Sequence, residues 1–389
     1  MASAEAGPVF MNGVNYGDVF IPEDFFADAD FFEKNGIPKV ADQYSLCDFV
    51  GSKHQTKAAM EEWLKDHIVE SEFAEMKAMG INVLRLPLGY WHLVDMPGNP
   101  NAEPAVAERQ GHLKDIMPAA DYRPYIDQVT RYAGANGIQV LYDLHGAPGG
   151  QSGESNAGCS TKGFALNGVD KEKGSEGYAY WDTPWNQKWT TAAFAAMAQI
   201  CKDAGDTCYG LELLNEPLQT LSRESLEGWY QHAIQVARRD VLLPHHVPIV
   251  VMDWMGPIQS HWLNRWHDAF PEATYGKVLL ETHIYDFKNT VQEEQQSWDA
   301  GQWPAVKAIA AKVPLFIGEY TLSLNRDIPT HELHGWASWI TGRLHDNGTL
   351  GGAHWLWNNK ARKFWSMRSM STLETNGGVD WAKVFSHWW

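Results

Sequence analysis

Two glutamates end two apolar stretches that lie far apart in this sequence of 389 residues. Residues 211–214 predict a buried strand, and Asn215, Glu216 and a proline, which cannot extend a β-ladder, follow it. Glu319 ends a second such stretch, residues 314–319. Two carboxylates at strand ends suit glycoside hydrolysis, in which one donates a proton and the other attacks or activates water. Either glutamate alone could be a solvated loop acid, but the pair in matching contexts indicates a glycosidase.

The elements that must position this pair alternate along the whole chain. Strands are predicted at residues 9–15, 81–88, 137–145, 211–214, 248–253, 278–285, 314–319 and 351–357. Helices are predicted at 56–79, 122–135, 185–204, 224–239, 257–269, 291–311 and 331–344. Eight buried strands separated by helices predict an α/β fold, a (β/α)8 TIM barrel, and no linker divides the chain. We therefore expect one catalytic domain over residues 1–389.

Active sites of this fold lie at the carboxyl ends of the strands. The polar and aromatic residues predicted there are Asn15, Arg85, His145, Asn215, Glu216, Asp253, His283, Tyr285, Glu319 and Trp357. Arg85, inside an apolar strand, requires a buried anion, and Glu319 is the natural candidate. Two long loops, residues 92–120 and 147–183, are expected to wall the barrel mouth. A walled pocket favours cleavage at the end of a sugar chain.

Composition narrows the range of partners. The net charge of −17 argues against nucleic acid and anionic membranes as partners. Nineteen tryptophans exceed the usual share, and rings that stack on sugar faces would account for the surplus. No apolar run reaches membrane-spanning length. We expect a β-glucan or β-glucoside as substrate and a monomer, although no motif addresses the oligomeric state.

The cysteines leave the redox compartment open. Cys201 and Cys208 could form a local disulfide, and buried free thiols are the alternative for them as for Cys47 and Cys159. The first residues have neither the basic nor the apolar region of a signal peptide. Acidity and a sequon at Asn347 nevertheless fit an extracellular, secreted protein, with a cytoplasmic one as the alternative.

Neither a metal nor a cofactor is predicted. The segment His331-Glu332-Leu333-His334 has its histidines three apart and is not the HExxH zinc motif. The four cysteines lack the spacing of a zinc site. No phosphate-binding or dinucleotide-binding glycine pattern occurs in the right context.

The ordered set of strand-end motifs resembles glycoside hydrolase family 5, and within it the exo-β-1,3-glucanase (glucan β-1,3-glucosidase) branch. The matching segments are Gly13-Val14-Asn15-Tyr16-Gly17 with Glu23, Leu84-Arg85-Leu86-Pro87-Leu88-Gly89-Tyr90-Trp91, Asp143-Leu144-His145-Gly146-Ala147-Pro148-Gly149, Leu214-Asn215-Glu216-Pro217, His283-Ile284-Tyr285, Gly318-Glu319-Tyr320 and Trp355-Leu356-Trp357. They span nearly the whole chain in family order.

The resemblance implies a role for each site residue. Glu216 would be the general acid/base and Glu319 the nucleophile of a double-displacement reaction with a covalent glycosyl-enzyme. The implied substrate-binding residues are Glu23, His145, Asn215, Tyr285 and Trp357, with Arg85 and His283 in support and Trp357 as the floor of the first subsite. Arg85 and Tyr285 should lower the pKa of Glu319, whereas a less polar setting and the nearby charge should raise that of Glu216.

The sequence also departs from this branch. Glu154 stands where the branch carries one ring of an entrance clamp, and Phe287 follows Tyr285 closely where the other ring is expected. Laminarin-like β-1,3-glucan is the predicted substrate. The alternatives are β-1,6-glucan, steryl or ceramide glucosides and flavonoid glucosides, and, from another class, a carbohydrate-binding barrel without catalysis.

Overall fold

The computed structural model describes residues 10–22, 53–97, 117–158, 181–256, 258, 260–359, 362–373 and 378–386. Glu23, Cys47 and Cys159 lie outside these ranges, as do large parts of the two long loops predicted to wall the barrel mouth.

Eight parallel strands close into a barrel in chain order. They are β1 Met11–Asn15, β2 Val83–Gly89, β3 Gln139–Gly146, β4 Cys208–Glu212, β5 Ile249–Met252, β6 Val278–Ile284, β7 Leu315–Tyr320 and β8 Gly351–His354. The predicted (β/α)8 barrel is confirmed. Each of the eight predicted strands overlaps an observed one, although β4 begins earlier than predicted and ends at Glu212, two residues before the predicted end.

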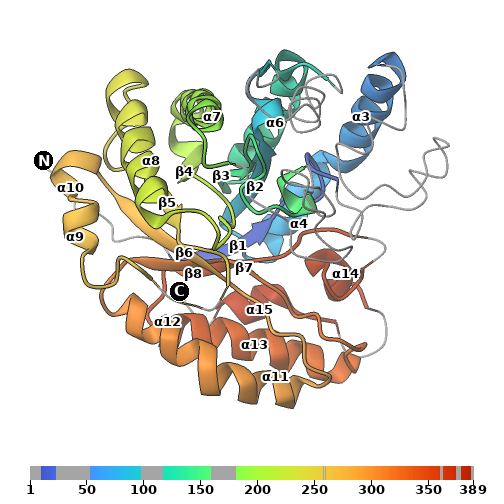
Figure 1. Ribbon diagram of the computed structural model, residues 1–389. Coiled ribbons are helices and arrows are strands. Elements are labelled where there is room, and N and C mark those ends of the chain that lie inside the picture. The colour runs from blue at the N-terminus through green and yellow to red at the C-terminus, as the bar shows by residue number, and fades with distance from the viewer. Residues whose placement is uncertain are drawn as a thin grey trace, which may run out of the picture.

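Helices surround the barrel, with α6, α7 and α8 on one side and α11, α12 and α13 on the opposite side (Figure 1). The described helices are α3 Lys53–His67, α4 Glu70–Ala78, α6 Ala119–Ala135, α7 Pro184–Ala204, α8 Arg223–Gln235, α9 Trp266–Ala269, α10 Glu272–Tyr275, α11 Val291–Ser297, α12 Trp303–Ala310, α13 Thr330–Asp346, α14 Met367–Ser371 and α15 Trp381–Ser386. Short 3-10 or π segments extend α7, α8 and α11, namely Gly205–Thr207, Val236–Asp240 and Trp298–Gln302. Two more, Tyr90–His92 and Ser155–Ala157, lie in the loops after β2 and β3. In the part of the chain that is described, no helix combines the length and apolarity that crossing a bilayer requires.

Three predicted helices differ from the observed ones. The helix expected over residues 56–79 is divided into α3 and α4, because Val69 is extended at φ −106° and ψ 118°. The helix expected over 291–311 is interrupted by a π segment before Pro304, which lacks the N–H that a regular turn would use. Within the described part of 257–269, only Trp266–Ala269 is helical, and the N–H of His261 instead binds the Asp253 carboxylate at 2.6 Å.

Two layers of side chains inside the barrel follow from the two-residue period of strands. The lower layer is apolar and consists of Met11, Val83, Leu141, Val250, Leu279 and Phe316. The charged layer contains Arg85, Asp143 and Glu281, each two residues beyond a member of the apolar layer on β2, β3 and β6. Glu212 of β4 pairs in register with Val250 of β5. The apolar layer closes the barrel floor, so the charged layer above it is held toward the mouth.

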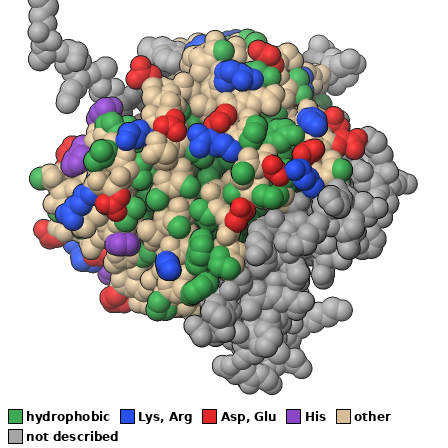
Figure 2. All heavy atoms as spheres, turned by 90° about the horizontal axis from the view of Figure 1, so that it is seen from above, with side chains coloured by type: hydrophobic (Ala, Val, Ile, Leu, Met, Phe, Trp, Pro, Cys, Tyr) green, Lys and Arg blue, Asp and Glu red, His purple; other side chains and the backbone are tan. Residues whose placement is uncertain are grey.

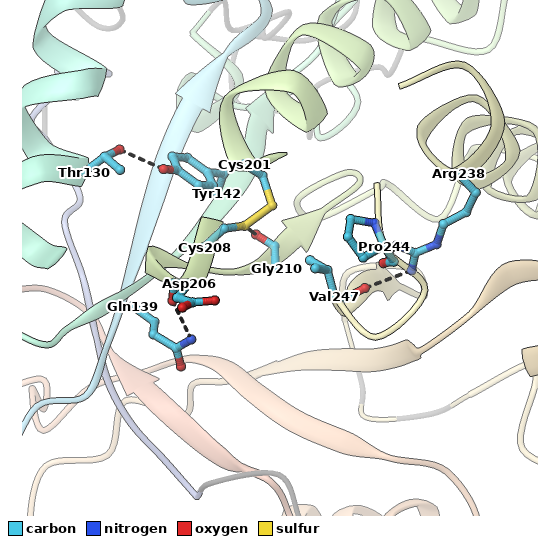
Figure 3. Close-up of a disulfide and its surroundings, with 10 residues drawn as sticks. All are labelled: Thr130, Gln139, Tyr142, Cys201, Asp206, Cys208, Gly210, Arg238, Pro244 and Val247. Carbon is cyan, nitrogen blue, oxygen red and sulfur yellow. Dashed lines mark hydrogen bonds between the residues drawn. A yellow bond between two sulfur atoms is a disulfide. The ribbon is translucent and has the colours of Figure 1, made fainter. Parts of the chain in front are cut away.

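A disulfide joins the end of α7 to the start of β4 (Figure 3). Cys201 and Cys208 are seven residues apart, and the bond selects one of the two alternatives left open by the sequence. Close by, the Thr130 and Tyr142 hydroxyls hydrogen-bond at 2.7 Å and fasten α6 to β3. On the face in Figure 2, charges of both signs are interspersed with hydrophobic side chains.

Candidate active site

The barrel brings Glu216 and Glu319 together. One carboxylate oxygen of each, with a ring nitrogen of His283, lies within 4.8 Å of the others. Glu216 follows β4 and has a left-handed backbone, φ 46°, which is costly for a residue other than glycine and is typical of functional sites. Its N–H contacts the Met252 sulfur at 3.3 Å, which helps to hold this conformation.

A β-bulge turns Glu319 inward. The pairing of β6 with β7 steps from Thr282–Ile317 to His283–Glu319, so Gly318 is the extra residue. A bulge redirects the side chains that follow it. Glycine is required at this position, because a Cβ there would overlap the carboxylate of Glu281. The bulge therefore places Glu319 at the mouth while Glu281 fills the space beneath it.

Two donors hold the Glu319 carboxylate, which is nearly buried. Arg85 donates from Nη1 to Oε1 at 2.9 Å, and the Tyr285 hydroxyl donates to Oε2 at 2.7 Å. The predicted placement of Arg85 and Tyr285 beside Glu319 is thus confirmed. Both contacts fix the orientation of the carboxylate at the barrel mouth, as a nucleophile requires.

Arg85 is fully buried and contacts more carboxylates than the one predicted from the sequence. Its Nε and Nη2 bind Glu212 in a bidentate pair, both at 2.7 Å. Asp143 lies 3.1 Å and Glu281 3.5 Å from Nη2. Burial raises the pKa of Asp143 to about 8 and those of Glu212 and Glu281 to about 7, because one cation offsets several carboxylates only in part.

His283 links Glu216 to this buried layer. Its Nδ1 lies 2.7 Å from Oε1 of Glu216, and its Nε2 lies 3.0 Å from Oε1 of Glu281. Burial alone would lower the pKa of His283, but the charge of Glu319 and the hydrogen bonds to Glu216 and Glu281 outweigh burial and raise it well above its usual value. The imidazolium therefore donates from both nitrogens.

The pKa of Glu216 moves opposite to the prediction. Burial would raise it, but the hydrogen bond and charge of His283 outweigh burial and hold the pKa of Glu216 below its ordinary value. Asn156 donates to the other oxygen at 2.6 Å and stabilises the same ionised form. The expectation of a raised pKa was wrong because no local pattern indicated that a histidine cation would touch Glu216.

Three groups here could hold a metal ion by distance alone, namely Glu216, His283 and Glu319. Both nitrogens of His283 already face carboxylates, however, so the ring has no free lone pair to offer. The arrangement instead suits proton transfer and nucleophilic attack.

Comparison with known proteins agrees with this geometry. Residues 42–361 match the sequence model of the family described as Cellulase (glycosyl hydrolase family 5). The chain belongs to glycosyl hydrolase family 5. The predicted family resemblance is confirmed.

Curated relatives of this family 5 chain include enzymes of the predicted branch. A glucan 1,3-beta-glucosidase of Blumeria graminis is 28% identical over 281 residues, covering 71% of this chain and 55% of that protein. A probable glucan 1,3-beta-glucosidase A of Emericella nidulans is 26% identical over 325 residues, 81% of this chain and 68% of that protein. The chain thus spans little more than half the length of the first relative.

Solved structures share the fold. Rutinosidase from Aspergillus niger superposes with a TM-score of 0.67 at 16% identity, covering 93% of this chain and 96% of that chain. Thermotoga maritima Cel5A in complex with mannotriose gives a TM-score of 0.56 at 14% identity, covering 97% of both chains.

The remaining predicted residues of the family 5 site surround the glutamates. His145 is neutral, because burial lowers its pKa to about 4, and its Nδ1 contacts Asp143 at 2.7 Å. Asn215 accepts a hydrogen bond from Arg85 at 2.8 Å, which turns its amide nitrogen toward Nε2 of His145, 3.5 Å away. Glu23, also predicted, lies outside the described residues.

Trp357 does not lie where a sugar floor is needed. Its indole N–H is bound to Glu72 at 2.6 Å, which holds the ring against α4. Trp355 instead stacks on His145, with ring centres 5.6 Å apart and planes 13° apart. The prediction of Trp357 as the floor was therefore wrong, and Trp355 is the ring beside the site. Because β8 ends at His354, the alternation of side chains along a strand no longer determines which ring faces the mouth.

Five residues that support the site were given no role in the sequence analysis: Asp143, Asn156, Glu212, Glu281 and Trp355. Four of them have sequence features that could have indicated a role in the site. Three are acids inside apolar strands, which are rare unless paired, and one is a tryptophan within a recognised motif. Asn156, from a loop, carried none.

Proposed function

We propose that this family 5 chain is a retaining, chain-end β-glucosidase that releases glucose from the non-reducing end of a β-glucan. Glu319 is the nucleophile and Glu216 the acid/base. The supporting observation is the separation of their carboxylate oxygens, within 4.8 Å. Retaining enzymes need about 5–5.5 Å between the carboxyls, whereas inverting enzymes need about 6.5–9.5 Å to admit a water.

In the first step an oxygen of Glu319 attacks the anomeric carbon while the bond from that carbon to the leaving oxygen breaks. Glu216 gives a proton to that oxygen, which leaves as an alcohol. In the second step Glu216 takes a proton from water, the water oxygen attacks the same carbon, and Glu319 is released. Two inversions at one carbon retain its configuration.

The proton for the first step is stored on His283. In the free enzyme Glu216 is ionised and accepts a hydrogen bond from Nδ1 of His283 at 2.7 Å. A sugar that fills the site displaces water from Glu216 and makes its charged form less favourable. The proton then crosses this short hydrogen bond to Glu216, next to the leaving oxygen.

Neutral donors and one ring hold the glucosyl unit. The amide of Asn215 faces the 2-hydroxyl, and neutral His145 faces other hydroxyls of the same sugar. Trp355 forms the floor, since it stacks on His145 and is close to Tyr285. Glu23 is retained from the resemblance as a contact of the non-reducing sugar.

The catalytic test substitutes each of the two glutamates. Glu319→Gln should abolish turnover of an aryl β-glucoside while its thermal unfolding stays close to wild type. Glu216→Ala should lose most activity on laminari-oligosaccharides but much less on an aryl glucoside whose phenolate leaves without protonation. Glu332→Gln, near the start of α13 with a side chain 41% exposed, is the matched control. Equal losses of Glu216→Ala on both substrates, or full turnover by Glu319→Gln, would refute the roles.

The linkage is proposed as β-1,3, supported by the names of the curated relatives. Comparing kcat/KM on laminari-oligosaccharides, β-1,6-gluco-oligosaccharides and aryl, steryl, ceramide and flavonoid glucosides decides among the alternatives. A preference for laminari-oligosaccharides is expected. Binding of all these compounds without any hydrolysis would favour a carbohydrate-binding barrel.

We also propose an extracellular location. Disulfides persist in oxidising compartments and are rare in the cytosol, and one joins Cys201 to Cys208. The acidic net charge agrees with a secreted enzyme.

A further inference from the structure

A cavity of about 620 Å³ lies beside the active site. Its walls come from three loops that follow β6, β7 and β8, namely Phe287, residues 323–327 and residues 362–365. Because these loops follow the carboxyl ends of strands, the cavity opens on the same face of the barrel as Glu216 and Glu319.

Aromatic rings connect this cavity to the candidate nucleophile. Tyr285, which donates to Glu319, stacks on Phe287 with ring centres 5.8 Å apart and planes 22° apart. Trp365 lies 5.5 Å from Phe287 and 6.1 Å from Tyr285. Phe287 is 38% exposed, which is unusual for a large apolar ring and leaves its face open to a ligand. Tyr285 thus contacts both Glu319 and Phe287 of the cavity wall, and so connects the cavity to the reaction centre.

The lining is basic, in contrast to the chain as a whole. Arg326, Arg362 and Lys363 line the cavity with one acid, Asp327, in a chain of net charge −17. The Lys363–Asp327 pair is 3.8 Å apart and largely exposed, so it neutralises little. Three cations against one carboxylate leave a local charge of +2 on the described lining. Arginine in particular matches the geometry of a carboxylate.

The loops are held in place before any ligand binds. Asn325 binds the loop after β6 twice, with its N–H on the carbonyl of Lys288 at 2.9 Å and its side chain on the carbonyl of Phe287. The backbone carbonyl of Trp365 accepts a hydrogen bond from the N–H of Leu356 at 2.7 Å. The backbone N–H of Trp365 donates to the carbonyl of Arg362 at 2.9 Å. A preorganised pocket loses less entropy on binding than a mobile one.

We propose that this cavity binds a negatively charged, carboxylate-bearing leaving group, which makes acidic β-glucosides a second class of substrate beside β-glucan. The inference rests on the proposed function. An enzyme that removes one terminal glucosyl unit has a single subsite for it, so a second pocket on the same face receives the leaving group. The rings contact its planar or apolar part and the cations bind its carboxylate. Besides a β-glucan, the chain should therefore accept an acidic glucoside, such as one of a carboxylated phenol, as a second class of substrate.

The test compares 4-carboxyphenyl and 4-carbamoylphenyl β-glucoside, which are similar in size and differ in charge. In wild type, kcat/KM for the acid relative to the amide should fall about fivefold or more when salt rises from 0.05 to 0.5 M. Arg326→Gln and Lys363→Gln should each lower that ratio about fivefold, and the double variant further. Because each variant is compared on two substrates, intrinsic reactivity cancels. Arg343→Gln, on α13 and outside the cavity, should leave the ratio unchanged.

A ratio unaffected by both glutamine variants would overturn the proposal. A failure of the proposed function is distinguished from a failure of the cavity proposal by measuring, with calorimetry, how the two glucosides bind to Glu319→Gln. This measurement needs no turnover. Tighter binding of the acid that is lost with Arg326→Gln supports the cavity even if wild type cleaves neither compound. Equal binding of acid and amide refutes it even if both are cleaved.

Discussion

Glu281→Gln should make the protein relatively more stable at alkaline pH. Glu281 is 1% exposed, and burial raises its pKa from 4.5 to about 7, with the charge of Glu212 adding to the effect. At a pH between these two pKa values, Glu281 holds a proton in the folded state and has released it in the unfolded state. The stabilisation by this group is therefore full below its unfolded pKa and is lost as pH rises toward 7.

The magnitude follows from the shift. A change from 4.5 to about 7, at about 1.4 kcal/mol for each pH unit, corresponds to about 3 kcal/mol lost by wild type across this window. Glutamine carries no charge and escapes this loss. With about 2.1 cal/mol/K of unfolding entropy per residue over 389 residues, 3 kcal/mol is about 4 °C in Tm.

The assay is thermal or urea unfolding of wild type and Glu281→Gln at pH 5 and pH 8. The contacts that glutamine loses with Arg85 and His283 cost stability at both pH values and cancel in the comparison. Because part of the loss has already occurred at pH 5, the stability of the variant relative to wild type should be about 2–3 kcal/mol higher at pH 8 than at pH 5. Glu332→Gln should show no such change. A relative stability of Glu281→Gln that is independent of pH, or lower at pH 8, would refute this account of the buried layer.

Three further outcomes are expected. Gly318→Ala should displace the carboxylate of Glu281 and lower both Tm and kcat/KM, whereas an active, equally stable variant would contradict the tight bulge. Cys201→Ser should cost about 2–3 kcal/mol in unfolding free energy, and reductant should destabilise wild type but not the variant. Asn156→Ala removes a hydrogen bond to the charged Glu216 and should lower kcat/KM about 10- to 100-fold, with aspartate, which cannot donate, no better than alanine.

Much of the fold was determined by local sequence. Eight apolar stretches separated by helical segments predicted the barrel, because burial on both faces of a parallel strand requires a continuous apolar run. Arg85 within such a run required an anion, and Glu319 is one of its partners. The two glutamates were located because strand ends of this fold share one face.

What local sequence could not decide depended on contacts between distant strands. The β-bulge at Gly318 turns Glu319 inward, and only the pairing of β6 with β7 creates it. The choice of Trp355 over Trp357 depends on the chain path after β8 ends. The lowered pKa of Glu216 depends on a histidine that is 67 residues away in sequence. Side-chain direction and local charge are set by neighbours in space, and sequence order carries these only indirectly.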